Sequence, residues 1–169
     1  PVVQEFYRLV EQNESLPGII ESINFVLATS LPAGRFVAAG LVSLDEASHS
    51  GEVWVGGIPG VQMLDDAGHI VRRFESRNLP LGVTRDTEGI KTFERFTWAE
   101  STRLVMLSDG VVEATGPTGE AFGEARLAGS LAIRRGDDLV AHLRAALTAH
   151  LDTVPAHDDI SILVIDCPA

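Results

Sequence analysis

The spacing of apolar residues predicts helices at the start of the chain. Apolar side chains recur every three or four positions in two segments, 2–10 and 19–27, and Pro17 and Gly18 stand between them. Proline interrupts a continuing helix because it lacks an N–H and its ring collides with the preceding turn. The pattern therefore predicts two helices, or one helix that breaks near Pro17.

The middle of the chain predicts a series of antiparallel strands. Apolar or alternating runs occupy 36–44, 51–55, 61–64, 70–74, 91–98 and 103–107. The turn residues 65–68 join the third and fourth runs and predict a hairpin. Short strands that follow one another through turns are typical of an antiparallel meander.

The last part of the chain predicts two helices and a closing strand. A helix is predicted over 124–133 and a better one over 137–151, in which Leu139, Leu143 and Leu147 share a stripe. The apolar run 160–165 completes a sheet. Helices, strands, helices and a final strand describe an α+β layered fold, and no repeat or linker divides 1–169 into further domains.

Composition narrows the class of protein. The 169 residues are 45% hydrophobic and 22% charged, which is typical of a soluble globular domain with a real core. No apolar run approaches the roughly 20 residues that span a bilayer, and the first residues lack the basic start of a secretory signal. A single cysteine, Cys167, fits a reducing compartment. We therefore expect a cytoplasmic protein without a membrane segment.

The charge excludes one class of partner. Thirteen basic and 24 acidic residues give a net charge of −11. A protein with this charge repels the phosphates of nucleic acids and the headgroups of anionic membranes. We therefore expect neither nucleic acid nor a membrane as the main partner, and basic or metal-dependent partners remain possible.

Two aspartates stand where predicted strands meet loops. Asp109 follows the run 103–107 and is itself followed by Gly110, which we expect to turn the backbone sharply. Asp158 comes just before the run 160–165, and Asp159 beside it is expected to support the loop through hydrogen bonds. Carboxylates on rigid strand ends are a common source of ligands for magnesium or manganese. The alternatives are a turn residue that caps a strand, for Asp109, and a solvated loop acid, for Asp158.

The histidines add no second site by spacing. His157, next to Asp158, is more often an exposed loop residue than a ligand or a general acid. His142 and His150 lie eight positions apart on one predicted helix, too far to hold a single ion, and we expect both at the surface.

A set of motifs in fixed order resembles a known family. The motifs are 31–37 leading into 41–45, then 79–83, Asp109-Gly110-Val111-Val112-Glu113-Ala114, 119–127 with Gly119-Glu120-x-Phe122-Gly123, and Asp158-Asp159-Ile160-Ser161. In this order and spacing they resemble the SpoIIE branch of the type 2C metal-dependent protein serine/threonine phosphatases. The resemblance covers the whole chain but only the later part of that family's domain.

The resemblance implies a fold and a metal site. It implies an αββα sandwich of two antiparallel sheets flanked by helices, with two Mg²⁺ or Mn²⁺ ions bridging a hydroxide that attacks phosphorus. Asp109 and Asp158 would be metal ligands in such a site, with Gly110 and Asp159 in support.

The sequence also departs from the family. The Gly-Asp near the domain's N-terminus and the Gly-Asp-Val-Ser-Gly-His-Gly-like segment, which supply the remaining carboxylates, do not occur, and 56–60 replaces the usual Asn-Ala-Gly-His. The N-terminal strands of the domain are thus missing from this sequence. Either the chain is a C-terminal output domain of a longer signalling protein, or it is a degenerate copy.

Two functions remain open at this point. The first is a metal-dependent phosphatase acting on serine or threonine of a phosphorylated bacterial regulatory protein. The second is a pseudophosphatase that binds proteins as the output module of a response regulator in a sigma-factor pathway. A homodimer is compatible with both.

Overall fold

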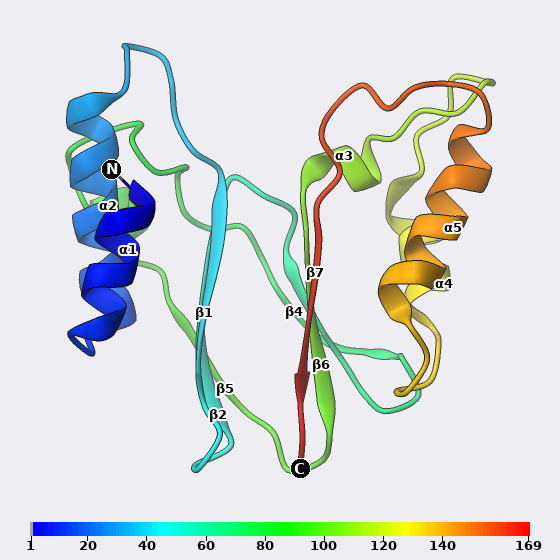
Figure 1. Ribbon diagram of the computed structural model, residues 1–169, viewed down its shortest axis with the longest axis horizontal. Coiled ribbons are helices and arrows are strands. Elements are labelled where there is room, and N and C mark those ends of the chain that lie inside the picture. Colours follow the sequence, from blue (N-terminus) through cyan, green and yellow to red (C-terminus); the bar gives the residue numbers. More distant parts are fainter. Residues whose placement is uncertain (1) are drawn as a thin grey trace. The chain divides into compact units, whose positions relative to one another are not determined.

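Two antiparallel sheets and the helices beside them form residues 2–169, the part of the chain that this computed structural model describes (Figure 1). The helices are α1 Val2–Glu11, α2 Leu16–Ser30, α3 Asp109–Val112, α4 Gly123–Leu131 and α5 Leu139–Leu151, with a 3₁₀ turn at Glu88–Ile90. The strands are β1 Ala39–Asp45, β2 Ser50–Gly56, β3 Val61–Leu64, β4 Ile70–Phe74, β5 Glu94–Thr97, β6 Thr102–Leu107 and β7 Ile162–Cys167. The α+β prediction is confirmed.

The chain divides into two compact units. Unit 1 consists of Pro1–Ile58 and Glu75–Thr97, and unit 2 of Pro59–Phe74 and Trp98–Ala169. Unit 1 carries the three-stranded sheet β1-β2-β5, and unit 2 carries the four-stranded sheet β4-β3-β6-β7. Each unit has its own hydrophobic core.

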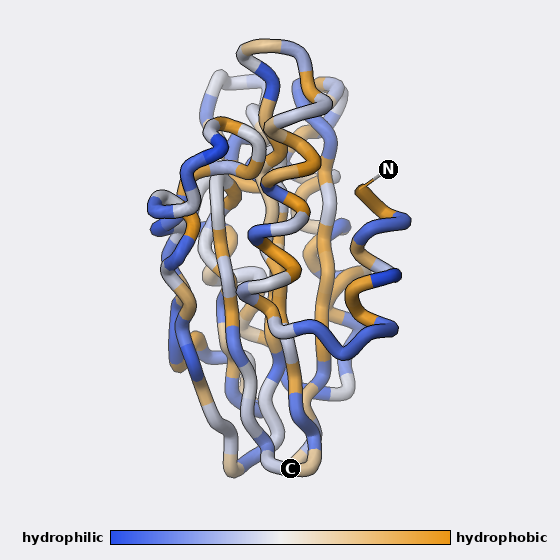
Figure 2. The backbone as a smooth tube through the Cα atoms, turned by 90° about the vertical axis from the view of Figure 1, so that its left-hand side faces the viewer, coloured by the Kyte–Doolittle hydropathy of each residue, from blue (hydrophilic) through white to orange (hydrophobic). Residues whose placement is uncertain are grey.

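The two N-terminal helices of unit 1 are separate, as one of the two sequence interpretations proposed. Ser15 is the N-cap of α2, and its side chain accepts a hydrogen bond from the Gly18 N–H. Pro17 lies in the first turn of α2, where its missing N–H costs nothing. The chain therefore breaks before Pro17 and not at it. Figure 2 shows hydrophobic and hydrophilic residues alternating around α1, as expected for a helix with one buried face.

The core of unit 1 is built around Trp54 of β2. Its ring is fully buried, and its Nε1–H donates to the carbonyl of Ile90 at 2.7 Å. Buried residues of α1, α2 and the loops pack in the same cluster: Leu9, Leu16, Ile19, Ile20, Ile23, Leu27, Leu81 and Ile90. The apolar stripes that predicted the helices are thus the stripes that form the core.

Two strands of unit 1 are shorter than the sequence predicted. The run 36–44 becomes a strand only from Ala39, because Val37 forms an isolated bridge with Leu81 of a loop instead of extending β1. The run 91–98 becomes a strand only from Glu94, after the 3₁₀ turn. Alternation of polar and apolar residues does not show where strand pairing begins.

In unit 2, β6 is one of the two inner strands of the sheet, and all six of its residues are buried. It pairs antiparallel with β3 and with β7, and β3 continues into the predicted hairpin with β4. Val105 and Leu107 of β6 belong to the buried core of this unit. Leucines of α4 and α5 pack in the same core: Leu127, Leu131, Leu139, Leu143 and Leu147. Residues 2–169 contain no helix that is both long and apolar enough to cross a membrane.

The last strand is displaced from its predicted position. The prediction placed it at 160–165, but β7 runs from Ile162 to Cys167. Cys167, which had no expected role beyond a tail residue, is buried and lies opposite Thr102 of β6. The ladder ends before Ser161, whose N–H donates to the Ser108 side-chain hydroxyl at 2.9 Å and not to a main-chain carbonyl.

The contact between α1 and α2 includes a hydrogen bond to the Glu5 carboxylate, and this bond affects the pKa of that group. Hydrogen bonds from Arg8 and then Ser22 lower the pKa of the Glu5 carboxyl from 4.5 to about 2. The Ser22 hydroxyl donates to Glu5 Oε1 at 2.7 Å. Because the pKa is lowered on folding, this carboxylate stabilises the folded state above about pH 4.5, and the contribution is lost as pH falls toward 2.

We expect the substitution Ser22→Ala to raise the pKa of Glu5, because the carboxylate loses one donor. The measurement is an NMR titration of the Glu5 side-chain carboxyl. Ser30→Ala is the matched control, since the Ser30 hydroxyl bonds only to the Val26 carbonyl of its own helix at 2.6 Å. An unchanged Glu5 pKa in Ser22→Ala would contradict the assignment.

Candidate functional site

Two acidic segments of unit 2, far apart in sequence, lie side by side. The Ser108 N–H donates to the Ser161 carbonyl at 3.0 Å, and the Ser108 hydroxyl donates to the Asp159 carbonyl at 2.9 Å. The same hydroxyl oxygen accepts from the Ser161 N–H at 2.9 Å. We call segments 108–110 and 158–161 together the two-aspartate site.

A glycine is needed at position 110 because another main-chain segment lies close to it, and not because the chain turns there. The sequence predicted that it would turn the backbone sharply, but its φ is not positive and the chain continues into α3. A Cβ at this position would lie 2.5 Å from the carbonyl oxygen of Asp159. The glycine therefore lets the two segments approach, and the predicted turning role is corrected.

Asp109 lies just beyond the strand end at which it was expected. β6 ends at Leu107, Ser108 is the N-cap of α3, and Asp109 is the first residue of that short helix. The Asp109 side chain is exposed, and its Oδ1 accepts from the N–H of Gly110 at 3.0 Å. This bond is the kind that a turn residue makes, yet it leaves the carboxylate at the surface of the two-aspartate site.

Asp158 and Asp159 take different parts in the second segment. Asp158 is exposed, and its Oδ1 accepts from the Asp159 N–H at 2.7 Å. Asp159 is also exposed, and it is its main-chain carbonyl, not its side chain, that receives the Ser108 hydroxyl. The sequence had suggested that Asp158 comes just before the last strand. In the structure it lies four residues before the start of β7.

The donors suit a hard cation, but their number does not suit a two-metal centre. Carboxylate oxygens are the ligands that magnesium and manganese prefer. Within residues 2–169, however, no three or more His, Cys, Asp or Glu side chains gather where they could hold a metal ion. Asp109 and Asp158 offer a charge of about −2 against the +4 of two dications. The described residues do not complete such a centre, and we derive no reaction step through it.

Sequence reasoning missed one residue of this site. A serine before Asp-Gly could be read as an N-cap, but nothing in the sequence links Ser108 to a partner 53 positions away. His142 and His157 are exposed as expected. His150 is half-buried and hydrogen-bonded, so it is less exposed than a plain surface residue.

Comparison with known proteins identifies what the chain is similar to. The sequence profile of the family described as Stage II sporulation protein E (SpoIIE) matches residues 1–168. Among curated proteins, none gives a significant match.

Three solved structures illustrate the similarity of fold. The SiaA-PP2C domain of Pseudomonas aeruginosa has a TM-score of 0.79 at 20% identity, over 97% of this chain and 66% of that one. The RsbU and RsbW domains of Rv1364c from Mycobacterium tuberculosis give 0.75 at 16%, over 99% and 47%. The PP2C phosphatase domain of SpoIIE from Bacillus subtilis, with a regulatory fragment, gives 0.79 at 16%, over 96% and 47%. The chain thus spans between about half and two thirds of these chains, which share its fold.

We expect Gly110→Ala to destabilise the protein by about 1–3 kcal/mol, the usual cost of forcing an extra carbon into a packed position. The added methyl group collides with main-chain atoms of Asp159. Main-chain atoms cannot move aside as easily as the end of a flexible side chain. Urea unfolding measures the effect. Gly129→Ala in α4 is the control: nothing lies within 4 Å of its added Cβ, so it should stabilise the helix by roughly 0.5–1 kcal/mol. Equal effects of the two substitutions would rule out the close approach.

Ser108→Ala removes the hydroxyl that joins the two acidic segments. We expect a loss of about 1–2 kcal/mol, the net value of two hydrogen bonds in a site that water can partly reach. Unfolding in urea again provides the measurement, with Ser130→Ala as control, because the Ser130 hydroxyl bonds only to the Arg126 carbonyl one turn away. A loss no larger than that of the control would show that the hydroxyl bridge contributes nothing.

Proposed function

This chain belongs to the SpoIIE family, and from that premise we propose that it is the phosphatase part of a bacterial signalling protein, acting on phosphoserine or phosphothreonine of a regulatory protein. The family and the PP2C-like fold support phosphatase-type chemistry. The single observation that carries the proposal for this chain is the two-aspartate site, in which Ser108 holds the segment of Asp109 against that of Asp158.

The proposal assigns a role to each residue of that site. Asp109 and Asp158 would hold a magnesium or manganese ion through their carboxylates, and Gly110 allows their segments to meet. Asp159 supports the loop through its carbonyl. Any further carboxylates that a two-metal centre needs would have to be added to the two that residues 2–169 bring to this site.

A second candidate function rests on the shortage of ligands. Because residues 2–169 bring no third candidate ligand to the site, a degenerate pseudophosphatase is the alternative. In that case the fold binds its partner, a regulator of a sigma-factor pathway, without hydrolysing phosphate. The two functions differ in turnover and agree in partner binding.

The test is hydrolysis of p-nitrophenyl phosphate and of a phosphoserine peptide with Mn²⁺, by this chain and by any longer polypeptide of which it is found to be a part. We expect turnover in the longer polypeptide, and a loss of about 100-fold or more in kcat for Asp109→Asn or Asp158→Asn there, the scale on which one missing charged group at a reacting centre acts.

Asp66→Asn is the matched control for this experiment. Asp66 is exposed in the turn between β3 and β4, and it lies outside the two-aspartate site. Full activity in Asp109→Asn would refute the assignment of Asp109. No turnover in either length of protein, with a phosphorylated partner still bound, would favour the pseudophosphatase.

A further inference from the structure

The loop that follows α3 is a tight hairpin with an exposed tip. Thr115 and Ala121 form an isolated bridge, and the Gly116 N–H donates to the Glu120 carbonyl at 2.9 Å. The Phe122 N–H donates to the Ala114 carbonyl at 2.7 Å. We call residues 114–122 the α3–α4 loop.

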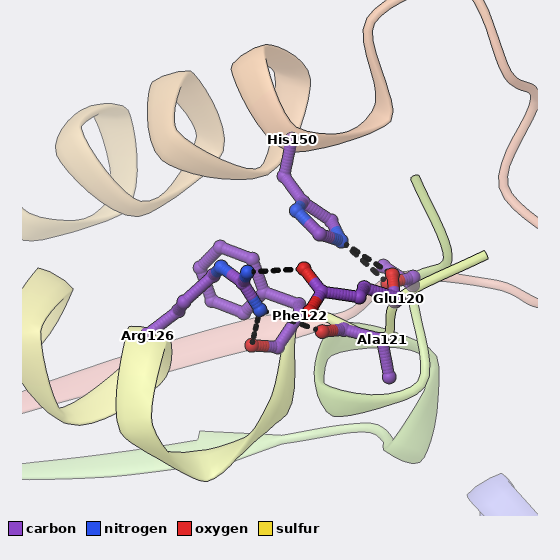
Figure 3. A network of polar contacts seen from close by, with 6 residues as sticks. Glu120, Ala121, Phe122, Arg126 and His150 are labelled. Atoms are coloured by element: carbon purple, nitrogen blue, oxygen red, sulfur yellow. Dashed lines mark hydrogen bonds and ion pairs between the residues drawn. The ribbon is translucent and has the colours of Figure 1, made fainter. Parts of the chain in front are cut away.

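His150, in the last turn of α5, contacts both sides of this loop (Figure 3). Its Nε2 lies 3.1 Å from the Ala114 carbonyl oxygen and 3.0 Å from the Glu120 carbonyl oxygen. Carbonyl oxygens only accept hydrogen bonds, so Nε2 must carry the hydrogen and donate to both. One imidazole N–H therefore joins the two ends of the α3–α4 loop to α5.

Packing reinforces this contact. The Phe122 ring is buried and meets the His150 ring edge to face, with centroids 5.5 Å apart. A Cβ on Gly116 would lie 2.6 Å from the His150 carbonyl oxygen, so a glycine is needed where the loop meets the helix. The ring is held by shape as well as by its hydrogen bonds.

Arg126 of α4 holds the same loop from a second helix (Figure 3). Its Nη1 donates to the Ala121 carbonyl at 2.9 Å, and its Nη2 donates to the Glu120 carboxylate at 2.7 Å. The loop tip remains exposed while its base is bonded to α4 and α5. The loop is therefore fixed at its base, and it constrains the positions of the helices to which it is bonded.

The two aspartates flank this assembly along the chain. α3 begins at Asp109 and leads directly into the α3–α4 loop, and the Glu113 N–H donates to the Asp109 carbonyl at 3.0 Å. α5 ends at Leu151, and the chain then runs through 152–157 to Asp158. His150 thus joins the segment that follows one aspartate to the helix that precedes the other.

We propose that His150 is a positioning residue that sets the placement of Asp109 relative to Asp158 by fixing the α3–α4 loop to the last turn of α5. This inference rests on the proposed function, in which both carboxylates serve one site. His150 does not touch the reacting atoms and acts through the loop and the helix alone.

The test compares His150→Leu, which keeps an apolar body but has no donor, with His150→Gln, whose amide N–H can replace Nε2–H. His142→Leu is the matched control, because His142 is exposed on the same helix. In the longer polypeptide, we expect His150→Leu to lower kcat roughly tenfold with KM unchanged, about the value of one hydrogen bond, and His150→Gln to restore it. His142→Leu should match the unsubstituted protein.

A second readout does not need turnover. Amide hydrogen exchange of Gly116 and Phe122 should accelerate in His150→Leu, and the amide resonances of Gly110 and Asp159 should shift, with recovery of both in His150→Gln. Nitrogen-15 NMR of the imidazole should show the hydrogen on Nε2. Unchanged resonances at Gly110 and Asp159 in His150→Leu would overturn the positioning role, even if the loop exchanged faster.

The two proposals fail in different ways. Absence of turnover in every form of the protein would overturn the phosphatase, while the NMR comparison would still decide the role of His150. Turnover in the unsubstituted protein that His150→Leu leaves intact would overturn the positioning role and leave the phosphatase standing.

Discussion

The close approach of two backbone segments at Gly110 is the constraint on which the rest of the site depends. Only a residue without a side chain can stand so near the Asp159 carbonyl. The register of β6 and β7, which ends with Leu107 opposite Ile162, delivers both segments to the same edge of the sheet. The Ser108 hydroxyl then bonds to two main-chain groups of the second segment, the Asp159 carbonyl and the Ser161 N–H. Sheet pairing, glycine and serine together make one site from two distant stretches of chain.

Much of the fold could be predicted because burial follows sequence periodicity. The leucine stripe of α5 and the hairpin of β3 and β4 were predicted from spacing and turn residues alone, and both were confirmed. Predictions failed where a backbone bond to a distant residue replaced a local pattern. Val37 pairs with Leu81 instead of joining β1. The Ser161 N–H donates to the Ser108 hydroxyl, and β7 begins one residue later. The spacing of apolar residues along the chain does not predict partners that are distant in sequence.

The candidate site was predictable in part and for a different reason. Asp109 and Asp158 were singled out by their places at strand ends and by a resemblance to the SpoIIE branch, and the structure brings their segments together. The reason for Gly110 was misjudged, because a sequence shows that a side chain is absent but not which atom would have collided with it. His150 was expected at the surface because its hydrogen-bond partners lie 36 and 30 positions away in the sequence. Contacts of this range are fixed by tertiary packing.

The pairing of β6 with β7 also bears on how unit 2 folds. The hairpin of β3 and β4 closes over the five residues 65–69, whereas Ser108 meets Asp159 across 51 positions, with three helices between them. Long loops close slowly, and non-local strand pairs commonly form after local ones. The two-aspartate site therefore belongs to the late-forming part of the unit. Changes there should alter the lifetime of the native state, through its rate of unfolding, more than the speed with which the chain first folds.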